Sequence, residues 1–279
     1  MVHDPTASPE RVLLNGAPDQ QVSPHDRALH FGDGLFETIA CCRSRPRFLT
    51  FHLDRLRRGC ERLGLQQVDL AVIATEVRAL ARDSERSIVK VILTRGAAVA
   101  RGYGLTGSEK ATRITFRYGW PSETQTESQD GVRIRTAQLR LGENPALAGL
   151  KHCNRLEQVL ARSEWTDPAI AEALLYSSSG RLVSGTMSNV FTVKGSQLRT
   201  PRLDVCGVAG VMRRIVLREA RQAGMAVEEG MLGVEDPREA EELFLTNARI
   251  GIWPVRELDG RPLQPGPVTR RLQTLLAPL

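Results

Sequence analysis

Apolar residues in the first third of the chain recur at helical intervals in two segments. Within residues 52–65 they return every three or four positions, with the run ending near Gly64, and residues 70–82 repeat this spacing. An interval near 3.6 residues is typical of amphipathic helices. Both segments are therefore expected to be helices with one buried face.

Shorter runs rich in valine, isoleucine and leucine indicate strands. These strands are predicted at residues 11–15, 35–42, 87–94, 112–118, 132–139, 171–177, 189–193 and 243–246. Further helical patterns cover residues 154–165, residues 210–224 and the C-terminal end. The mixture of helices and strands predicts an α+β fold.

A polar stretch without periodicity, residues 121–131, separates the two halves of this pattern. Such composition is typical of an interdomain linker. We therefore expect two domains. An N-terminal α/β domain covers residues 1–120, and a C-terminal α/β domain covers residues 132–279.

The overall composition is that of a globular protein, with 41% hydrophobic and 25% charged residues among 279. No apolar run approaches the roughly 20 residues that cross a bilayer, and no signal peptide is visible at the N-terminus. The five cysteines are scattered and form no CxxC pair, which argues against a disulfide framework or a zinc site. These features predict a cytoplasmic protein with no membrane partner and no metal.

The net charge of +6 raises the question of a nucleic-acid partner. Arginine is spread along the whole chain, and aromatic residues are only 5%, so no basic tract stands out. A solvated arginine surface explains the charge better, and we expect no nucleic-acid partner. The positive field instead favours a small anionic substrate.

Lysine is rare in this chain: there are four lysines against 34 arginines. Three of them, Lys90, Lys110 and Lys194, lie in or beside predicted strands with no distinctive context. The fourth, Lys151, belongs to the unusual run at residues 150–158. An amine can lose its proton and attack a carbonyl, whereas a guanidinium cannot. This contrast favours Lys151 as a covalent catalytic residue.

Five motifs occur in an order that resembles a known family. They are Gly32–Thr38, His52–Leu56, Leu150–Arg155, Gly210–Arg213 and Thr246–Val255. Together they resemble the fold type IV pyridoxal-phosphate enzymes, the group of branched-chain and D-amino acid aminotransferases. Within that group the run at residues 151–158 is most similar to the aminodeoxychorismate lyases. The resemblance covers nearly the whole chain from about residue 13 and implies pyridoxal 5'-phosphate as cofactor and a homodimer.

The resemblance implies roles for three residues in catalysis and substrate binding. Lys151 would hold the cofactor covalently and then act as the base on the substrate, which requires a neutral amine. Thr38 would relay a proton, although a β-branched residue is also ordinary in a strand. Arg101, in the glycine-rich loop at residues 95–104, would pair with a substrate carboxylate, with a mobile surface loop as the alternative.

The cofactor phosphate requires concentrated positive potential, and the resemblance implies where it comes from. Arg55 is the implied phosphate ligand, with a solvated helix face as the alternative. Backbone N–H groups of Val211 and Met212 at the start of a helix would point at the anion. Asn247 and Ala248 would add donors, although Asn247 also fits a turn-capping role.

One cofactor-binding position departs from the family pattern. The family places a glutamate five residues before the equivalent of Asn189, facing the pyridine nitrogen, whereas this chain has Ser184. A carboxylate keeps the nitrogen protonated and makes the ring a stronger electron sink, whereas a hydroxyl suits the neutral nitrogen. The weaker sink favours a reaction driven by formation of an aromatic product over transamination.

The predicted function is therefore a pyridoxal-phosphate lyase that converts 4-amino-4-deoxychorismate to 4-aminobenzoate and pyruvate, a step in folate synthesis. Two alternatives stay open. One is an aminotransferase of D- or branched-chain amino acids. The other is a catalytically degenerate protein that binds the cofactor but is inactive, because Ser184 stands where the family has a carboxylate.

Overall fold

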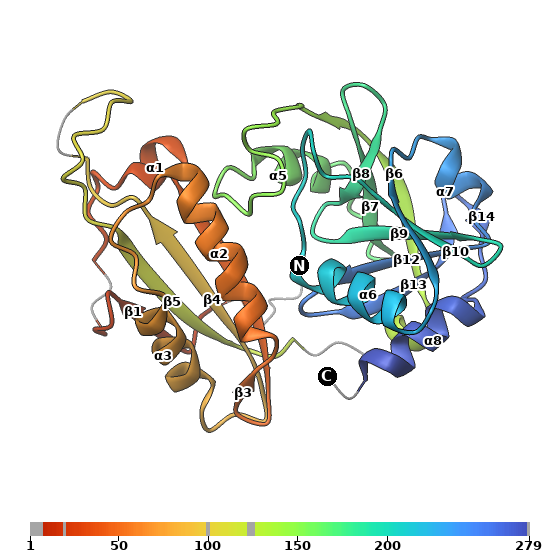
Figure 1. The fold of residues 1–279 in the computed structure, drawn as a ribbon, viewed down its shortest axis with the longest axis horizontal. Helices are drawn as coiled ribbons and strands as arrows, with labels where there is room; N and C mark the ends of the chain where they lie inside the picture. Colours follow the sequence, from red (N-terminus) through yellow and green to blue (C-terminus); the bar gives the residue numbers. More distant parts are fainter. Residues whose placement is uncertain (1–7, 19–20, 99–100, 122–125, 278–279) are drawn as a thin grey trace. The chain divides into compact units, whose positions relative to one another are not determined.

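The computed structural model describes residues 8–18, 21–98, 101–121 and 126–277 and divides into two compact units (Figure 1). The first unit comprises residues 1–122 together with 151–154, and the second comprises 123–150 together with 155–279. The expected linker at 121–131 lies partly outside the described residues, at 122–125. Its remaining part contains the short helix α4 (Thr126–Asp130).

The first unit is built on a five-stranded antiparallel sheet in the spatial order β1, β5, β4, β2, β3. Its strands are β1 (Arg11–Leu14), β2 (Gly34–Cys42), β3 (Arg45–Pro46), β4 (Arg86–Thr94) and β5 (Thr112–Gly119). Apart from the two-residue β3, these strands confirm the sequence prediction to within about one residue at each end.

Three helices accompany this sheet: α1 (Arg27–Phe31), α2 (Leu49–Leu63) and α3 (Leu70–Ala81). The apolar stripes of α2 and α3 pack with alternate residues of β2 and β4 to form one core. Helix α2 ends where Gly64 takes a left-handed conformation, as its sequence predicts. Helix α3 begins after Asp69, whose side chain caps it by accepting from the amides of Ala71 and Val72.

The second unit contains a nine-stranded mixed sheet. The main order is β11, β10, β9, β12, β13, β6, β7, β8, with β14 beside β13, and the pairs β10–β11, β13–β6 and β6–β7 are parallel. The strands are β6 (Val132–Leu141), β7 (Ile170–Ser177), β8 (Leu182–Gly185), β9 (Asn189–Lys194), β10 (Gln197–Pro201), β11 (Ala226–Gly230), β12 (Glu242–Asn247), β13 (Gly251–Leu258) and β14 (Arg261–Pro262).

The helices of the second unit after α4 are α5 (Leu156–Arg162), α6 (Val211–Gln222), α7 (Glu235–Glu239) and α8 (Pro267–Leu276). Helix α5 begins at Leu156 and not at 154, after a segment that pairs with β2, and it ends at Arg162 and not at 165. Among the described residues, no helix is long and apolar enough to span a membrane. The α+β class is confirmed.

Candidate active site

Lys151 lies on an extended segment that adds to the sheet of the first unit beside β2. The amide of Phe36 donates to the Lys151 carbonyl at 2.9 Å, and the amide of Cys153 donates to the Gly34 carbonyl at 2.9 Å. This antiparallel pairing places the Lys151 side chain on the same side as Phe36, and its Nζ is 4.2 Å from the centre of the Phe36 ring.

The two faces of β2 carry different chemistry because side chains alternate along a strand. Leu35, Ile39 and Cys41 pack into the core with α2 and α3. Phe36 and Thr38 lie on the opposite, half-buried face. The structure therefore brings the Thr38 hydroxyl to the side of the sheet that carries Lys151.

A second lysine, Lys90, stands on this same face and was missed by the sequence prediction. It is directly opposite Thr38 in the pairing of β2 with β4. Its Nζ is 5.6 Å from the ring centre of Phe36, the ring that Lys151 also contacts. Only the strand pairing reveals this placement, since no local motif marks Lys90.

Arg55 belongs to a buried charged cluster on the other face of β2. Its Nε donates to Glu37 Oε1 at 2.7 Å, and its Nη2 donates to Glu37 Oε2 at 2.5 Å. His52 Nδ1 lies 2.6 Å from Glu37 Oε2. The side chains of His52 and Glu37 are 1% and 2% exposed, and that of Arg55 is 15% exposed. Arg55 is thus held by a carboxylate rather than lying on a solvated helix face.

The charge states of this cluster follow from burial and pairing. Burial alone would raise the pKa of Glu37, but Arg55 and the hydrogen bond from His52 outweigh it and lower that pKa to about 2. Burial lowers the pKa of His52, although Glu37 partly offsets this. His52 is therefore neutral with its proton on Nδ1. Its Nε2 has no hydrogen-bond partner among the described residues.

The second unit holds Ser184 and Asn189, on neighbouring segments. Ser184 lies on β8, is buried, and is opposite Leu175 of β7. Asn189 begins β9, and its Nδ2 donates to the Val208 carbonyl at 2.9 Å. A Cβ at Gly210 would lie 2.0 Å from Asn189 Oδ1, so a larger residue there would displace this side chain.

Helix α6 starts immediately after Gly210, with Val211 and Met212 in its first turn. The residue at the N-cap position is Gly210, which has no side chain to cap the helix. The leading N–H groups of an uncapped helix, together with its dipole, attract an anion. The segment thus has the donor chemistry that a phosphate requires.

Asn247 stands at the end of β12 and holds a turn. Its Oδ1 accepts from the amides of Arg249 and Ile250, both at 2.9 Å, and its Nδ2 donates to the Met187 carbonyl at 3.2 Å. Its side chain therefore caps the turn, which agrees with the turn-capping role that the sequence allowed for it.

The sequence prediction also missed Glu172, a buried carboxylate on β7. It accepts hydrogen bonds from the amide and hydroxyl of Thr186, the amide of Met187, the hydroxyl of Ser188 and the amide of Ala173, at 2.5 to 3.1 Å. The only signal in the sequence is an acidic residue inside a run of buried strand positions. With so many donors, Glu172 fixes the turn after Ser184.

The first unit supplies an amine at Lys151 and a cation at Arg55, which suit the aldehyde and the phosphate of pyridoxal phosphate. The second unit supplies N–H groups at the start of α6, which suit a phosphate, and a hydroxyl at Ser184, which suits a ring nitrogen. The residues of each unit therefore fit this cofactor. Residues 34–258 match the family described as amino-transferase class IV, and the chain belongs to this family, whose members depend on pyridoxal phosphate. The resemblance inferred from the motifs is confirmed.

The chain is also similar to individual members of this family. The aminodeoxychorismate lyase of Vibrio harveyi is 31% identical over 93% of this chain and 97% of its own length. The crystal structure of 4-amino-4-deoxychorismate lyase from Pseudomonas aeruginosa has 40% identity and a TM-score of 0.92, covering 96% of this chain and 98% of that one. A putative branched-chain-amino-acid aminotransferase of Methanocaldococcus jannaschii is 30% identical over 94% of both chains.

Proposed function

We propose that this protein is an aminodeoxychorismate lyase, which converts 4-amino-4-deoxychorismate to 4-aminobenzoate and pyruvate. The observation that carries the proposal is the placement of Lys151, Thr38 and Lys90 on one face of the sheet. An amine, a hydroxyl and a second cation suit a substrate that bears carboxylates and must lose a proton. The similarity to two lyases supports the same conclusion.

The chain's own residues divide the chemistry. When bound, the cofactor supplies an electron-withdrawing ring that makes the C4 hydrogen of the substrate acidic. The Lys151 amine would remove that proton. The bond between C3 and the enolpyruvyl oxygen breaks, and Thr38 relays a proton to the departing group. Loss of the C4 proton and of this group leaves an aromatic ring.

Other residues would hold the cofactor. Arg55 of the first unit and the backbone N–H groups of Val211 and Met212 would bind its phosphate, and Asn247 and Ala248 would add donors. The Ser184 hydroxyl would hydrogen-bond to the ring nitrogen. Asn189 would support cofactor binding without contacting the cofactor, because its side chain donates to the Val208 carbonyl and so fixes the loop before α6.

The test is release of 4-aminobenzoate, followed by its fluorescence, when cofactor-loaded protein meets enzymatically generated aminodeoxychorismate. Stoichiometric 4-aminobenzoate and pyruvate support the lyase. Conversion of D- or branched-chain amino acids with a keto acid, without 4-aminobenzoate, would establish the aminotransferase instead. Cofactor bound without turnover of any amine would establish the degenerate protein.

Replacing Ser184 by glutamate is expected to raise aminotransferase activity with a keto acid acceptor by about tenfold, because a carboxylate facing the ring nitrogen keeps it protonated. The measurement is amino-acid-dependent formation of the pyridoxamine form of the cofactor. Ser196→Glu, an exposed change on the turn between β9 and β10, is the matched control. Unchanged or lower transamination in Ser184→Glu would refute this role of Ser184.

We propose that the protein is a cytoplasmic homodimer. Helix α5 supports a second copy as the partner because three of its apolar residues lie on one exposed stripe. Leu156, Val159 and Leu160 are 69%, 60% and 50% exposed. Sedimentation velocity is expected to give twice the chain mass of 30.8 kDa. A single species at the monomer mass would contradict the dimer.

A further inference from the structure

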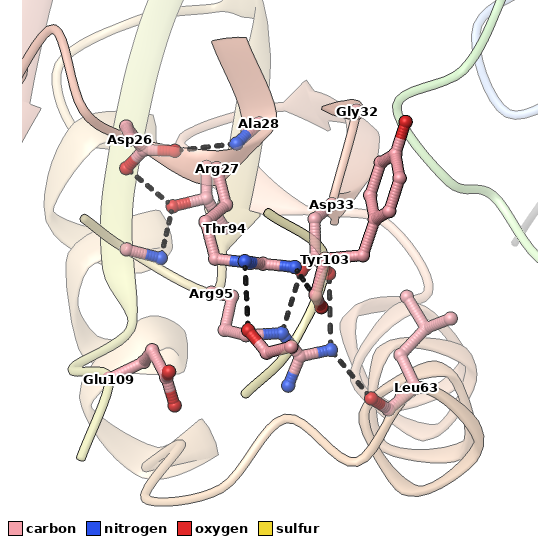
Figure 2. A network of polar contacts seen from close by, with 12 residues as sticks. Asp26, Arg27, Ala28, Gly32, Asp33, Leu63, Thr94, Arg95, Tyr103 and Glu109 are labelled. Atoms are coloured by element: carbon pink, nitrogen blue, oxygen red, sulfur yellow. Dashed lines mark hydrogen bonds and ion pairs between the residues drawn. The ribbon is translucent and has the colours of Figure 1, made fainter. Parts of the chain in front are cut away.

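Arg27, the first residue of α1, binds a loop far away in the sequence. Its Nη1 donates to the carbonyls of Gly102 and Gly104 at 3.3 and 3.4 Å, and its Nη2 donates to that of Tyr103 at 3.1 Å. Its Nε donates to Asp33 at 2.9 Å. Figure 2 shows Arg27 with Asp33 and Tyr103, and the Arg27 side chain is only 5% exposed.

Asp33 holds a second arginine in the same network. Arg95 donates through Nε and Nη2 to the two oxygens of Asp33, at 2.7 and 3.1 Å. It also donates to the carbonyls of Leu63 and Gly64 at the end of α2, at 2.7 and 3.0 Å. Burial would raise the pKa of Asp33, but Arg95 and Arg27 lower it, so the carboxylate stays charged and both arginines stay fixed.

The tract that carries Asp33 also binds the segment that follows Lys151. The Gly34 carbonyl accepts from the Cys153 amide, and the Gly32 carbonyl accepts from Asn154 Nδ2 at 3.2 Å. Gly32 has a φ of 65°, and a Cβ there would lie 2.2 Å from Asn154 Oδ1. One short, rigid tract thus connects to both the Lys151 segment and the Arg27 network.

The loop from 101 to 104 has little else to hold it. Tyr103 is 83% exposed, and its ring packs against that of Phe31, at 5.1 Å between centroids. Within the described residues, Arg27 is the only side chain that donates to the carbonyls of Gly102, Tyr103 and Gly104. The conformation of this loop therefore depends on one guanidinium.

We propose that Arg27 is a positioning residue for substrate binding: it fixes the backbone at 102–104 and thereby the neighbouring Arg101, which pairs with a substrate carboxylate. The inference rests on the proposed function for the identity of the substrate. Arginine is required because its fork reaches Asp33 and three carbonyls at once. A lysine keeps the charge but concentrates its donors at one point.

Arg27→Lys is expected to raise the KM for aminodeoxychorismate by about tenfold while kcat changes less than about twofold, because the loss is in binding and not in chemistry. Arg113→Lys is the matched control: Arg113 also pairs through two bonds, at 2.7 and 2.6 Å, with a carboxylate of the first unit, Glu76. Arg113→Lys should leave the KM for aminodeoxychorismate unchanged.

A double variant shows whether Arg27 acts through Arg101. If it does, Arg27→Lys combined with Arg101→Gln should have the KM of Arg101→Gln alone. Multiplying effects in the double variant, or an unchanged KM in Arg27→Lys, would overturn the proposal.

Tryptic cleavage after Arg101 gives a readout that does not depend on activity. In cofactor-loaded protein, Arg27→Lys is expected to speed this cut at least about fivefold, whereas Arg113→Lys should not, because only the former releases the loop. Arg101→Gln removes this cleavage site, so the fragment that is absent from its digest is the one produced by the cut after Arg101. Equal cleavage rates overturn the role of Arg27. If the parent protein lacks lyase activity, the proposed function fails, while cleavage still decides whether Arg27 holds the loop.

Discussion

Replacing Lys151 by alanine is expected to lower the rate of 4-aminobenzoate release by about 10³-fold or more, because the residue serves as both the covalent attachment of the cofactor and the base. Lys151→Arg should be equally inactive, since a guanidinium neither attacks an aldehyde nor loses its proton near neutral pH. The measurement is product fluorescence at saturating cofactor.

The control for this result is another lysine. Lys194 is 62% exposed and pairs with Glu239, so Lys194→Ala should keep the full rate. Cofactor that survives dialysis on the parent protein but is lost from Lys151→Ala would demonstrate the covalent attachment separately. More than a tenth of the parent rate in Lys151→Ala would disprove the role of this amine.

Replacing Glu37 by glutamine is expected to lower the free energy of unfolding by about 3–5 kcal/mol at pH 7, because it leaves the Arg55 charge buried without its partner. Urea unfolding of cofactor-free protein measures this loss. The variant should also bind the cofactor more weakly, because Glu37 orients the proposed phosphate ligand. Glu76→Gln, which removes the partner of Arg113 in the same unit, should leave cofactor affinity intact.

The effect of Glu37 should depend on pH in a defined direction. Its pKa falls from 4.5 to about 2 on folding, so the unfolded chain takes up more protons, and the stabilisation is lost as pH falls from near 4.5 towards 2. The pKa of His52 is lowered from 6.5, so protonation of the unfolded chain also destabilises the protein as pH falls below 6.5. If Glu37→Gln had the same free energy of unfolding as the parent protein at pH 7, this account of Glu37 would be contradicted.

Local patterns were sufficient for the elements whose periodicity is long or whose apolar run is continuous. Helix α3 and strand β4 match their predicted ranges to within one residue, whereas helix α2 begins three residues and ends two residues before the predicted positions. Helix α1 and strand β8 were missed because four or five residues carry too little periodicity. Their positions depend on contacts with distant parts of the chain.

In the candidate site too, local motifs predicted some residues, whereas contacts between distant parts of the chain determine others. The motifs pointed to Lys151 and Arg55, but the partners of these residues depend on the pairing of strands. Glu37 was visible only as part of a motif, and Lys90 seemed unremarkable. Which face of a strand a side chain occupies, and what lies opposite it, is set by register, which a single sequence does not specify.

The assignment of residues 151–154 to the first unit has a consequence for how the protein is made. A chain truncated after residue 122 would lack the segment that binds the Phe36 amide and the Gly34 carbonyl, so β2 would expose an unpaired edge. During synthesis, this edge of β2 stays unpaired until about thirty more residues have left the ribosome. The N-terminal unit is therefore a poor candidate for independent expression, and a cut between the units would have to spare this returning segment.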